Sequence, residues 1–252
     1  MDEKELLISK IKDLDRIAYE RDITKNSGFL GMSEQAVYMD IAGDLNSNNR
    51  FLCGGHEDYD RAMIIWPASY ADKENVPGSL ISCIRILPVD SRFADDLSHR
   101  DFLGALMNLG IERYCLGDIL VSSSSAYVYC TSEMSDFIVE NLPRVKHTDV
   151  QCRKVGLDEC DIVPVFDEVR VNVASERIDA VIAAVYNLSR TVAGRLITSE
   201  YVFIDGKTAK NSGMKIREGS RISVKNHGKF IYCGIDGTTK KSRLYIVVKK
   251  YV

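Results

Sequence analysis

The sequence lacks the residue patterns that build metal centres and disulfide frameworks. Its seven cysteines are scattered over 252 residues, and no two of them form a Cys-x-x-Cys pair. Structural zinc sites usually take ligands from such closely spaced pairs, and a disulfide framework rarely leaves an odd thiol. We therefore expect buried free thiols in a reducing compartment, with no metal and no other cofactor.

Long apolar runs and a secretion signal are also missing. The longest apolar run, Ala180 to Tyr186, is far shorter than the roughly 20 residues of a membrane-spanning helix. The first residues, Met-Asp-Glu-Lys-Glu, do not give the basic and then apolar segments of a secretion signal. The sequence therefore predicts a cytoplasmic protein with no membrane partner.

Signatures of common catalytic sites are absent too. No Gly-x-Gly occurs, so a dinucleotide- or methyl-donor-binding loop is not indicated. His99-Arg100-Asp101 resembles a protein-kinase catalytic loop, but Asn108 does not stand at that loop's spacing. His56-Glu57 lacks the second histidine of a zinc-protease helix. The sequence predicts a protein that is not an enzyme, and leaves open whether His99 and Arg100 contact RNA or a partner protein.

Charge is nearly balanced overall but unevenly distributed. The chain has 33 basic and 36 acidic residues, a net charge of −3. Residues 175–252 hold 15 Lys and Arg against 6 Asp and Glu, a net of +9, and the remaining 18 basic and 30 acidic residues give residues 1–174 a net of −12. Such a split suggests that the C-terminal part binds a polyanion. The alternative is a solvated basic surface without a partner.

Hydrophobic periodicity predicts an α+β protein, which begins with an N-terminal α/β region at residues 1–75. Its first helix has an apolar face, and Ser33 is expected to cap a second helix after a break at residues 28–31. Residues 50–54 and 62–66 are expected to be strands. The apolar helix positions are Leu7, Ile11, Leu14 and Ala18 in the first helix, and Val37, Ile41 and Leu45 in the second.

Residues 76–164 predict a ferredoxin-like (RRM-like) central domain. A helix at residues 99–109 is expected to begin with a capping box between Ser98 and Asp101 and to end at Gly110. A second helix is expected around residues 134–142. With the four expected strands, the order is strand-helix-strand-strand-helix-strand, which fits two helices on one face of an antiparallel sheet. Those strands are residues 80–87, 117–122, 126–130 and 147–155.

Residues 165–252 predict a compact basic module. An alternating strand at residues 165–173 leads to a helix, with Ser175 as the expected cap and Ile178, Val181, Ile182 and Val185 as its apolar face. After a corner at Asn187-Leu188, Ser189 is expected to cap a second, short helix. Short strands at residues 201–204 and 222–225 and a hairpin of 230–235 with 244–249 complete the module.

The start of that short helix has the features of a phosphate-binding site. Its first turn exposes unpaired N–H groups and the positive end of the helix dipole. Arg190 lies beside it and Arg195 about one and a half turns further on, and a guanidinium can hold a phosphate through two hydrogen bonds. We expect the positive face to be widened by Arg177, Lys207, Lys210 and Lys225. The alternative is that Ser189 only caps the helix and the arginines are solvated.

This segment resembles the RNA-binding module named after ribosomal protein S-four. The resemblance implies that Arg177, Ser189, Arg190, Arg195 and Lys207 face RNA. Two positions depart from the usual pattern: Asp205 stands where Asn is usual, and Ser220 stands where Asp is usual. The residues that carry the resemblance are Glu176-Arg177-Ile178-Asp179, Leu188-Ser189-Arg190, Ala193, Arg195-Leu196-Ile197, Val202-Phe203-Ile204-Asp205-Gly206-Lys207, Gly219 and Ile222-Ser223-Val224.

Segments further upstream and at the C-terminus resemble the bacterial YlmH family. They are His99-Arg100-Asp101-Phe102-Leu103-Gly104, Leu109-Gly110-Ile111-Glu112-Arg113, Leu116-Gly117-Asp118-Ile119, Thr239-Lys240-Lys241-Ser242-Arg243 and the final Lys-Lys-Tyr-Val. The resemblance implies a role on the large ribosomal subunit, in rescue of stalled nascent chains that involves peptidyl-tRNA.

Three functions therefore compete. The first is a monomeric binding factor for ribosomal RNA or tRNA on the large subunit. The second is an RNA-modifying enzyme of the pseudouridine synthase kind, because the S-four-like module often accompanies such enzymes. The third is an interaction protein linked to cell division, with the acidic part of the chain as its docking surface. The charge split favours the first. An electrostatic surface on which the guanidinium groups point apart, or are locked to neighbouring carboxylates, would overturn it.

Overall fold

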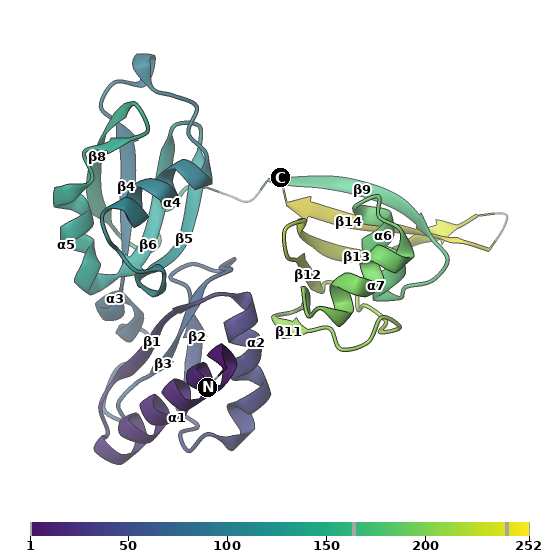
Figure 1. Ribbon diagram of the computed structural model, residues 1–252, viewed down its shortest axis with the longest axis horizontal. Coiled ribbons are helices and arrows are strands. Elements are labelled where there is room, and N and C mark those ends of the chain that lie inside the picture. Colours follow the sequence, from purple (N-terminus) through teal and green to yellow (C-terminus); the bar gives the residue numbers. More distant parts are fainter. Residues whose placement is uncertain (1, 163–164, 240–241, 252) are drawn as a thin grey trace. The chain divides into compact units, whose positions relative to one another are not determined.

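The computed structural model describes residues 2–162, 165–239 and 242–251 (Figure 1). The chain divides into two compact units, Met1–Ile162 (unit 1) and Val163–Val252 (unit 2). This division lies two residues from the expected boundary at 164/165. The other expected boundary, 75/76, lies within unit 1, where both parts contribute to one hydrophobic core.

The N-terminal part of unit 1 is a three-stranded antiparallel sheet with two helices. The helices are α1 (Glu3–Arg21) and α2 (Met32–Ile41), followed by the 3-10 helix η1 (Ala42–Asp44). The strand order is β1-β3-β2, from β1 (Lys25–Leu30), β2 (Phe51–Cys53) and β3 (Ala62–Trp66). Ile11 of α1, Tyr38 of α2 and Trp66 of β3 share a buried cluster. The expected opening helix and the strands at residues 50–54 and 62–66 are confirmed.

One expectation for this region is wrong, and one strand was missed. Residues 28–31 break the helical pattern as expected, but most of them belong to the strand β1, which was not predicted. Gly31, rather than Ser33, is the N-cap of α2, and its N–H donates to the Glu34 carboxylate over 2.6 Å. Because Glu34 accepts from the N–H of Gly31, the helix begins at Met32, two residues earlier than a cap at Ser33 would allow.

The central part of unit 1 is a five-stranded antiparallel sheet of order β5-β6-β4-β8-β7. Its strands are β4 (Ile81–Pro88), β5 (Leu116–Ser122), β6 (Ser125–Thr131), β7 (Arg144–Val145) and β8 (Thr148–Val155), and its helices are α3 (Val76–Leu80), α4 (His99–Asn108) and α5 (Ser132–Asn141), with 3-10 helices η2 (Ser91–Phe93) and η3 (Arg113–Cys115). The predicted capping box is present, because Ser98 N donates to the Asp101 carboxylate over 2.8 Å.

One face of this sheet is covered within unit 1, and the other is covered in part. Phe102 and Leu106 of α4 and Ile138 of α5 pack on one face. On the other face, Tyr129 of β6 belongs to a buried cluster with Phe29 and Met63 of the N-terminal part. The N-terminal part therefore covers only a portion of the second face, because Gln151 and Arg153 of β8, which lie on the same face, are exposed.

Unit 2 is a six-stranded antiparallel sheet of order β11-β10-β12-β13-β14-β9, with α6 (Ile178–Val185) and α7 (Arg190–Thr198) packed on one face. Phe230, Tyr232 and Val248 from the sheet are buried against Val181 and Ile182 of α6. The strands are β9 (Phe166–Val173), β10 (Val202–Ile204), β11 (Lys207–Thr208), β12 (Arg221–Val224), β13 (Gly228–Thr238) and β14 (Leu244–Tyr251).

The predicted elements of unit 2 are present, with two corrections. The N-cap of α6 is Arg177, so Ser175 lies before the cap. The hairpin strands are longer than expected, because β13 extends to Thr238 and leaves a short connection to β14. Lys240 and Lys241, which belong to the expected loop, lie outside the described residues.

The seven cysteines are free, and Cys83, Cys115 and Cys130 are buried while the other four are half-buried. Burial raises the pKa of the Cys83 and Cys130 thiols to about 12, which keeps them protonated. Among the described residues, no helix is both long and apolar enough to cross a membrane.

Candidate nucleic-acid interface

The corner between α6 and α7 places the start of α7 at the surface. Asn187 adopts a left-handed backbone conformation with φ of 53°, and Leu188 N donates to Ala183 O over 2.8 Å. The chain then reverses, and Ser189 Oγ accepts from Val192 N over 3.2 Å. The cap predicted for Ser189 is confirmed. It satisfies one of the unpaired N–H groups at this helix start and leaves others available.

Asp179 joins the two arginines that flank this corner. Its carboxylate accepts from Arg177 Nε and Nη2, each over 3.1 Å, and from Arg190 Nη2 over 2.6 Å. Only 9% of the Asp179 side chain is exposed, against 44% for Arg177 and 52% for Arg190. Burial alone would raise the pKa of Asp179, but the hydrogen bonds from both guanidinium groups lower it below its ordinary value.

This arrangement differs from the free guanidinium expected for Arg190. Arg177 and Arg190 are paired with a carboxylate, which is the condition that counts against phosphate binding. Two arginines share one carboxylate, however, so Arg177, Asp179 and Arg190 together (the trio) keep one net positive charge. Within the described residues Arg190 uses only Nη2 for this contact. A shared buried carboxylate therefore fixes two half-exposed guanidinium groups in place without neutralising both.

The segment from Ala209 to Ile216 lies next to the trio and forms backbone hydrogen bonds with the start of α6. Ile178 N donates to Met214 O over 2.8 Å, and Asp179 N donates to Ser212 O. Arg177 and Lys215 form an isolated antiparallel bridge, which brings Lys215 next to Arg177 along the backbone. Lys215 was missed in the sequence, because its position depends on a tertiary contact between two segments.

In the described part of the chain, no contact joins Arg195, Lys207 or Lys225 to Arg177, Asp179 and Arg190. Arg195 and Lys207 are exposed, and in the described part of the chain neither side chain has a hydrogen bond or ion pair. Lys210 is exposed. Lys225 Nζ lies 4.8 Å from the centre of the Tyr201 ring. Tyr201 N donates to Leu196 O, so Lys225 lies at the C-terminal end of α7.

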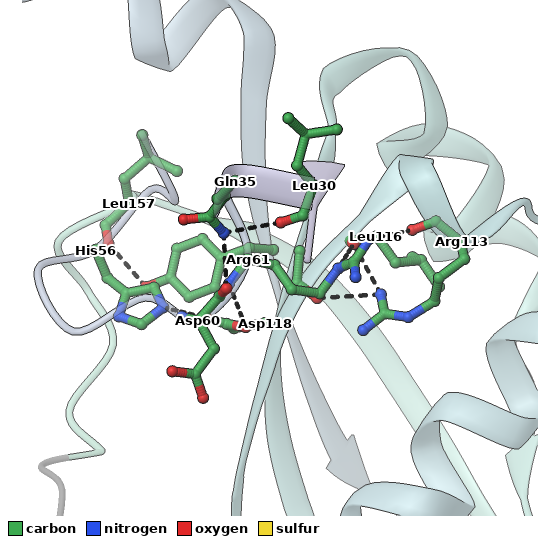
Figure 2. A network of polar contacts seen from close by, with 11 residues as sticks. Leu30, Gln35, His56, Asp60, Arg61, Arg113, Leu116, Asp118 and Leu157 are labelled. Carbon is green, nitrogen blue, oxygen red and sulfur yellow. Dashed lines mark hydrogen bonds and ion pairs between the residues drawn. The ribbon is translucent and has the colours of Figure 1, made fainter. Parts of the chain in front are cut away.

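A polar network in unit 1, shown in Figure 2, was also missed. Asp118 of β5 accepts from Asp60 N over 2.7 Å and from Arg61 N over 3.2 Å, and its Oδ2 lies 3.0 Å from His56 Nε2. Arg61 Nε donates to Leu116 O over 2.9 Å, and Arg113 Nη1 donates to the same carbonyl over 2.8 Å. The network joins the loop before β3 to β5, and so connects the two sheets of unit 1.

Burial and charge in this region shift the pKa of Arg113 and the pKa of His99. Burial, together with the positive charge of the neighbouring Arg61, lowers the pKa of Arg113 to about 10. Burial also lowers the pKa of His99, and the positive charge of Arg113 acts in the same direction. Arg61 and Arg113 satisfy backbone carbonyls, which is a structural role. Among the described residues, no three His, Cys, Asp or Glu side chains are grouped as metal ligands.

A groove of about 470 Å³ lies between α4 and the chain around β7. Arg100, Arg144 and Lys146 line it, together with one carboxylate, Asp101. Lys146 Nζ lies 3.2 Å from Asp101 and Arg144 Nε lies 2.7 Å from Asp149, so two of the three cations are paired. The groove is therefore only weakly basic.

Comparison with protein families matches both units. Residues 84–159 match the family described as "Putative RNA-binding domain in YlmH", and residues 176–222 match the S4 domain. The first match covers the central sheet and its helices, and the second covers the α6–α7 corner. The chain is thus an RNA-binding protein with two such domains. It carries a YlmH-type RNA-binding domain followed by an S4 domain.

Two known proteins are similar to this chain. The chain is 27% identical over 239 residues to "Ribosome-associated protein quality control protein P2" of Bacillus subtilis, a match that covers 93% of this chain and 90% of the relative. A solved structure, "Cell division protein ylmH from Streptococcus pneumoniae", is 18% identical with a TM-score of 0.49, and the match covers 63% of this chain and 94% of that one.

Proposed function

We propose that this protein is a non-catalytic factor that binds structured ribosomal RNA or tRNA on the large ribosomal subunit during quality control of stalled nascent chains. The observation that carries the proposal is the capped start of α7 between Arg177 and Arg190, which Asp179 holds in place. The net charge of +9 over residues 175–252 supports it. The name of the Bacillus subtilis relative supports the ribosomal setting.

The proposed contacts recognise the shape of the RNA backbone rather than the sequence of its bases. A phosphate at the start of α7 would accept hydrogen bonds from the free N–H groups of the first turn and from the remaining guanidinium N–H groups of Arg190. The exposed Arg195 and Lys207 would hold neighbouring phosphates, with Lys210 and Lys225 extending the positive surface. Because Asp179 already orients the arginines, less side-chain entropy is lost on binding.

For the central domain, we infer a ferredoxin-like sandwich. Its four long strands lie in the order β5-β6-β4-β8, and α4 and α5 cover one face. This arrangement supports the expected strand-helix-strand-strand-helix-strand fold. Since part of the second face packs on the N-terminal part, RNA would reach this domain through its loops, its helix edges and the exposed part of that face around Gln151 and Arg153.

Sedimentation of the protein with purified large subunits tests the proposal. We expect comigration, and if about four phosphates are neutralised the log-log salt slope is roughly −3 to −4. Arg190→Glu with Arg195→Glu is expected to abolish comigration, while Lys12→Glu with Lys73→Glu, a matched change of charge in unit 1, preserves it. Comigration that survives the first pair of changes would overturn the proposal.

A modification analysis tests the non-catalytic part of the proposal. Ribosomal RNA from cells that lack the protein is compared by mass spectrometry with RNA from parent cells. We expect identical modifications, and a missing one would favour an RNA-modifying enzyme.

We propose a cytoplasmic monomer, and light scattering of the purified chain would check its oligomeric state. A pull-down that survives ribonuclease and high salt would instead favour a protein-docking role.

A further inference from the structure

The sheet of unit 2 has a second face, opposite α6 and α7. Leu244, Ile246 and Val248 of β14 point into the core with their partners on β9. Side chains alternate along a strand, so the intervening residues of β14 lie on the opposite face. This outer face consists of Tyr245, Val247, Lys249 and Tyr251 of β14, with their register partners Asn172, Arg170, Glu168 and Phe166 of β9.

Aromatic and cationic side chains alternate on this outer face. The Arg170 guanidinium lies 4.2 Å from the centre of the Tyr245 ring, and Lys229 Nζ of β13 lies 4.4 Å from that of Tyr251. Phe166 packs edge-on against Tyr251, with ring centres 4.7 Å apart. Lys249 between the two tyrosines is exposed, and among the described residues its side chain has no ion-pair partner.

The charge of the outer face is positive. Arg170, Lys229, Lys249 and Arg243 carry four positive charges, and Arg243 reaches this face through hydrogen bonds to Asn172. Two carboxylates oppose them: Glu168, cross-strand from Lys249, and Asp236, which lies 2.8 Å from Arg170 Nε. The net charge is therefore about +2, on a surface whose apolar part is mostly aromatic.

We propose that the outer face of β9, β14 and β13 binds a single-stranded segment of the RNA, by stacking bases on Tyr245, Tyr251 and Phe166. This inference rests on the proposed RNA-binding function and adds a second site to it. The S4 match ends at residue 222, so β9, β13 and β14 lie outside it. Alternating aromatic rings and cations suit single strands, because rings stack on exposed bases while cations pair with the backbone.

The dimensions fit such a ligand. Tyr245 and Tyr251 are six residues apart on one strand, which corresponds to about 20 Å at a rise of about 3.4 Å per residue. Lys249 lies between them, where a backbone phosphate of the bound strand would pass. A platform of this length accommodates a strand of roughly four nucleotides or more, within the range of single-strand binding sites. The planar guanidinium of Arg170 on Tyr245 offers a further surface for stacking.

Binding of the full chain to a fluorescent oligouridine of about twelve nucleotides tests the inference. We expect Phe166→Leu with Tyr245→Leu and Tyr251→Leu to weaken binding at least tenfold, because leucine keeps an apolar side chain but cannot stack. Tyr245→Phe with Tyr251→Phe keeps the rings and serves as the matched control, with binding within about twofold of the parent. Thermal melts establish that each variant is folded.

Photo-crosslinking locates the contact. Oligouridine that contains 4-thiouridine is expected to crosslink to peptides of β9 or β14, and equal binding by the leucine and phenylalanine variants would overturn the inference. So would crosslinks confined to α7, or no oligouridine binding by a chain that still comigrates with large subunits. In those cases the proposed function stands, since it is judged by Arg190→Glu with Arg195→Glu on the subunit.

Discussion

Ser220 Oγ donates a hydrogen bond to Oδ2 of Asp205 over 3.0 Å, and the next residue, Arg221, donates its N–H to Oδ1 over 2.8 Å. These are the two positions where the chain departs from the usual S-four pattern, which has Asn at the first and Asp at the second. The usual pattern has its carboxylate at position 220, whereas this chain has it at position 205. Each pair contains a single acid and a single donor, so we expect the two departures to compensate each other.

A double-mutant cycle tests this compensation. Ser220→Asp places a second carboxylate against Asp205, and we expect it to lower the free energy of unfolding by about 1–2 kcal/mol. Adding Asp205→Asn restores the usual pair and should recover most of that loss. Urea unfolding of the full chain measures the coupling. Losses that simply add would show that the two side chains act independently.

Removal of the shared carboxylate tests whether orientation or charge governs RNA binding. Asp179→Asn makes the site more positive, so simple attraction predicts tighter binding. We expect the opposite, a loss of about threefold or more in affinity for large subunits at fixed salt, because Arg177 and Arg190 lose the group that orients them. Asp136→Asn, the same change of charge at an exposed carboxylate of unit 1, is the control, and tighter binding by Asp179→Asn would contradict the prediction.

Acid should destabilise unit 2 through the same residue. The pKa of Asp179 is below its ordinary value in the folded chain, so folding is favoured by its charged form. This contribution is complete above the ordinary pKa near 4 and is lost as pH falls through the lower, folded pKa. Unfolding of unit 2 followed between about pH 6 and pH 2 should therefore depend less steeply on pH in Asp179→Asn. Parallel curves for parent and variant would rule this out.

Asp118 should be essential to the stability of unit 1. Asp118→Ala removes a buried acceptor of two backbone N–H groups and the partner of His56, leaving these groups unpaired. We expect a loss of about 2–4 kcal/mol in the free energy of unfolding. Calorimetry of the full chain would show the effect in the transition of unit 1. Asp136→Ala, which removes only an exposed ion pair with Lys154, should cost less than about 1 kcal/mol.

Local sequence signals correctly located most elements of both units. The capping box of Ser98 and Asp101 and the cap at Ser189 are set by side chains within three residues of the helix start, so they follow from the sequence alone. The misplaced caps have a different cause. Gly31 and Arg177 carry no capping hydroxyl, and the helices begin there because Glu34 and backbone contacts with the segment 212–216 supply the partners.

The sequence by itself determined the charge split and the α+β composition, because each depends on composition or on short spacing, and its motifs gave the resemblance to the S-four module. Which residues of that module contact RNA stays a prediction. Only the tertiary structure decided how those residues are arranged. Asp179 could not be assigned as the link between Arg177 and Arg190, nor Asp118 as the acceptor for His56 and Arg61, since both depend on contacts across folded elements. The same holds for the outer sheet face, where the pairing register of β9 and β14 brings together side chains more than seventy residues apart.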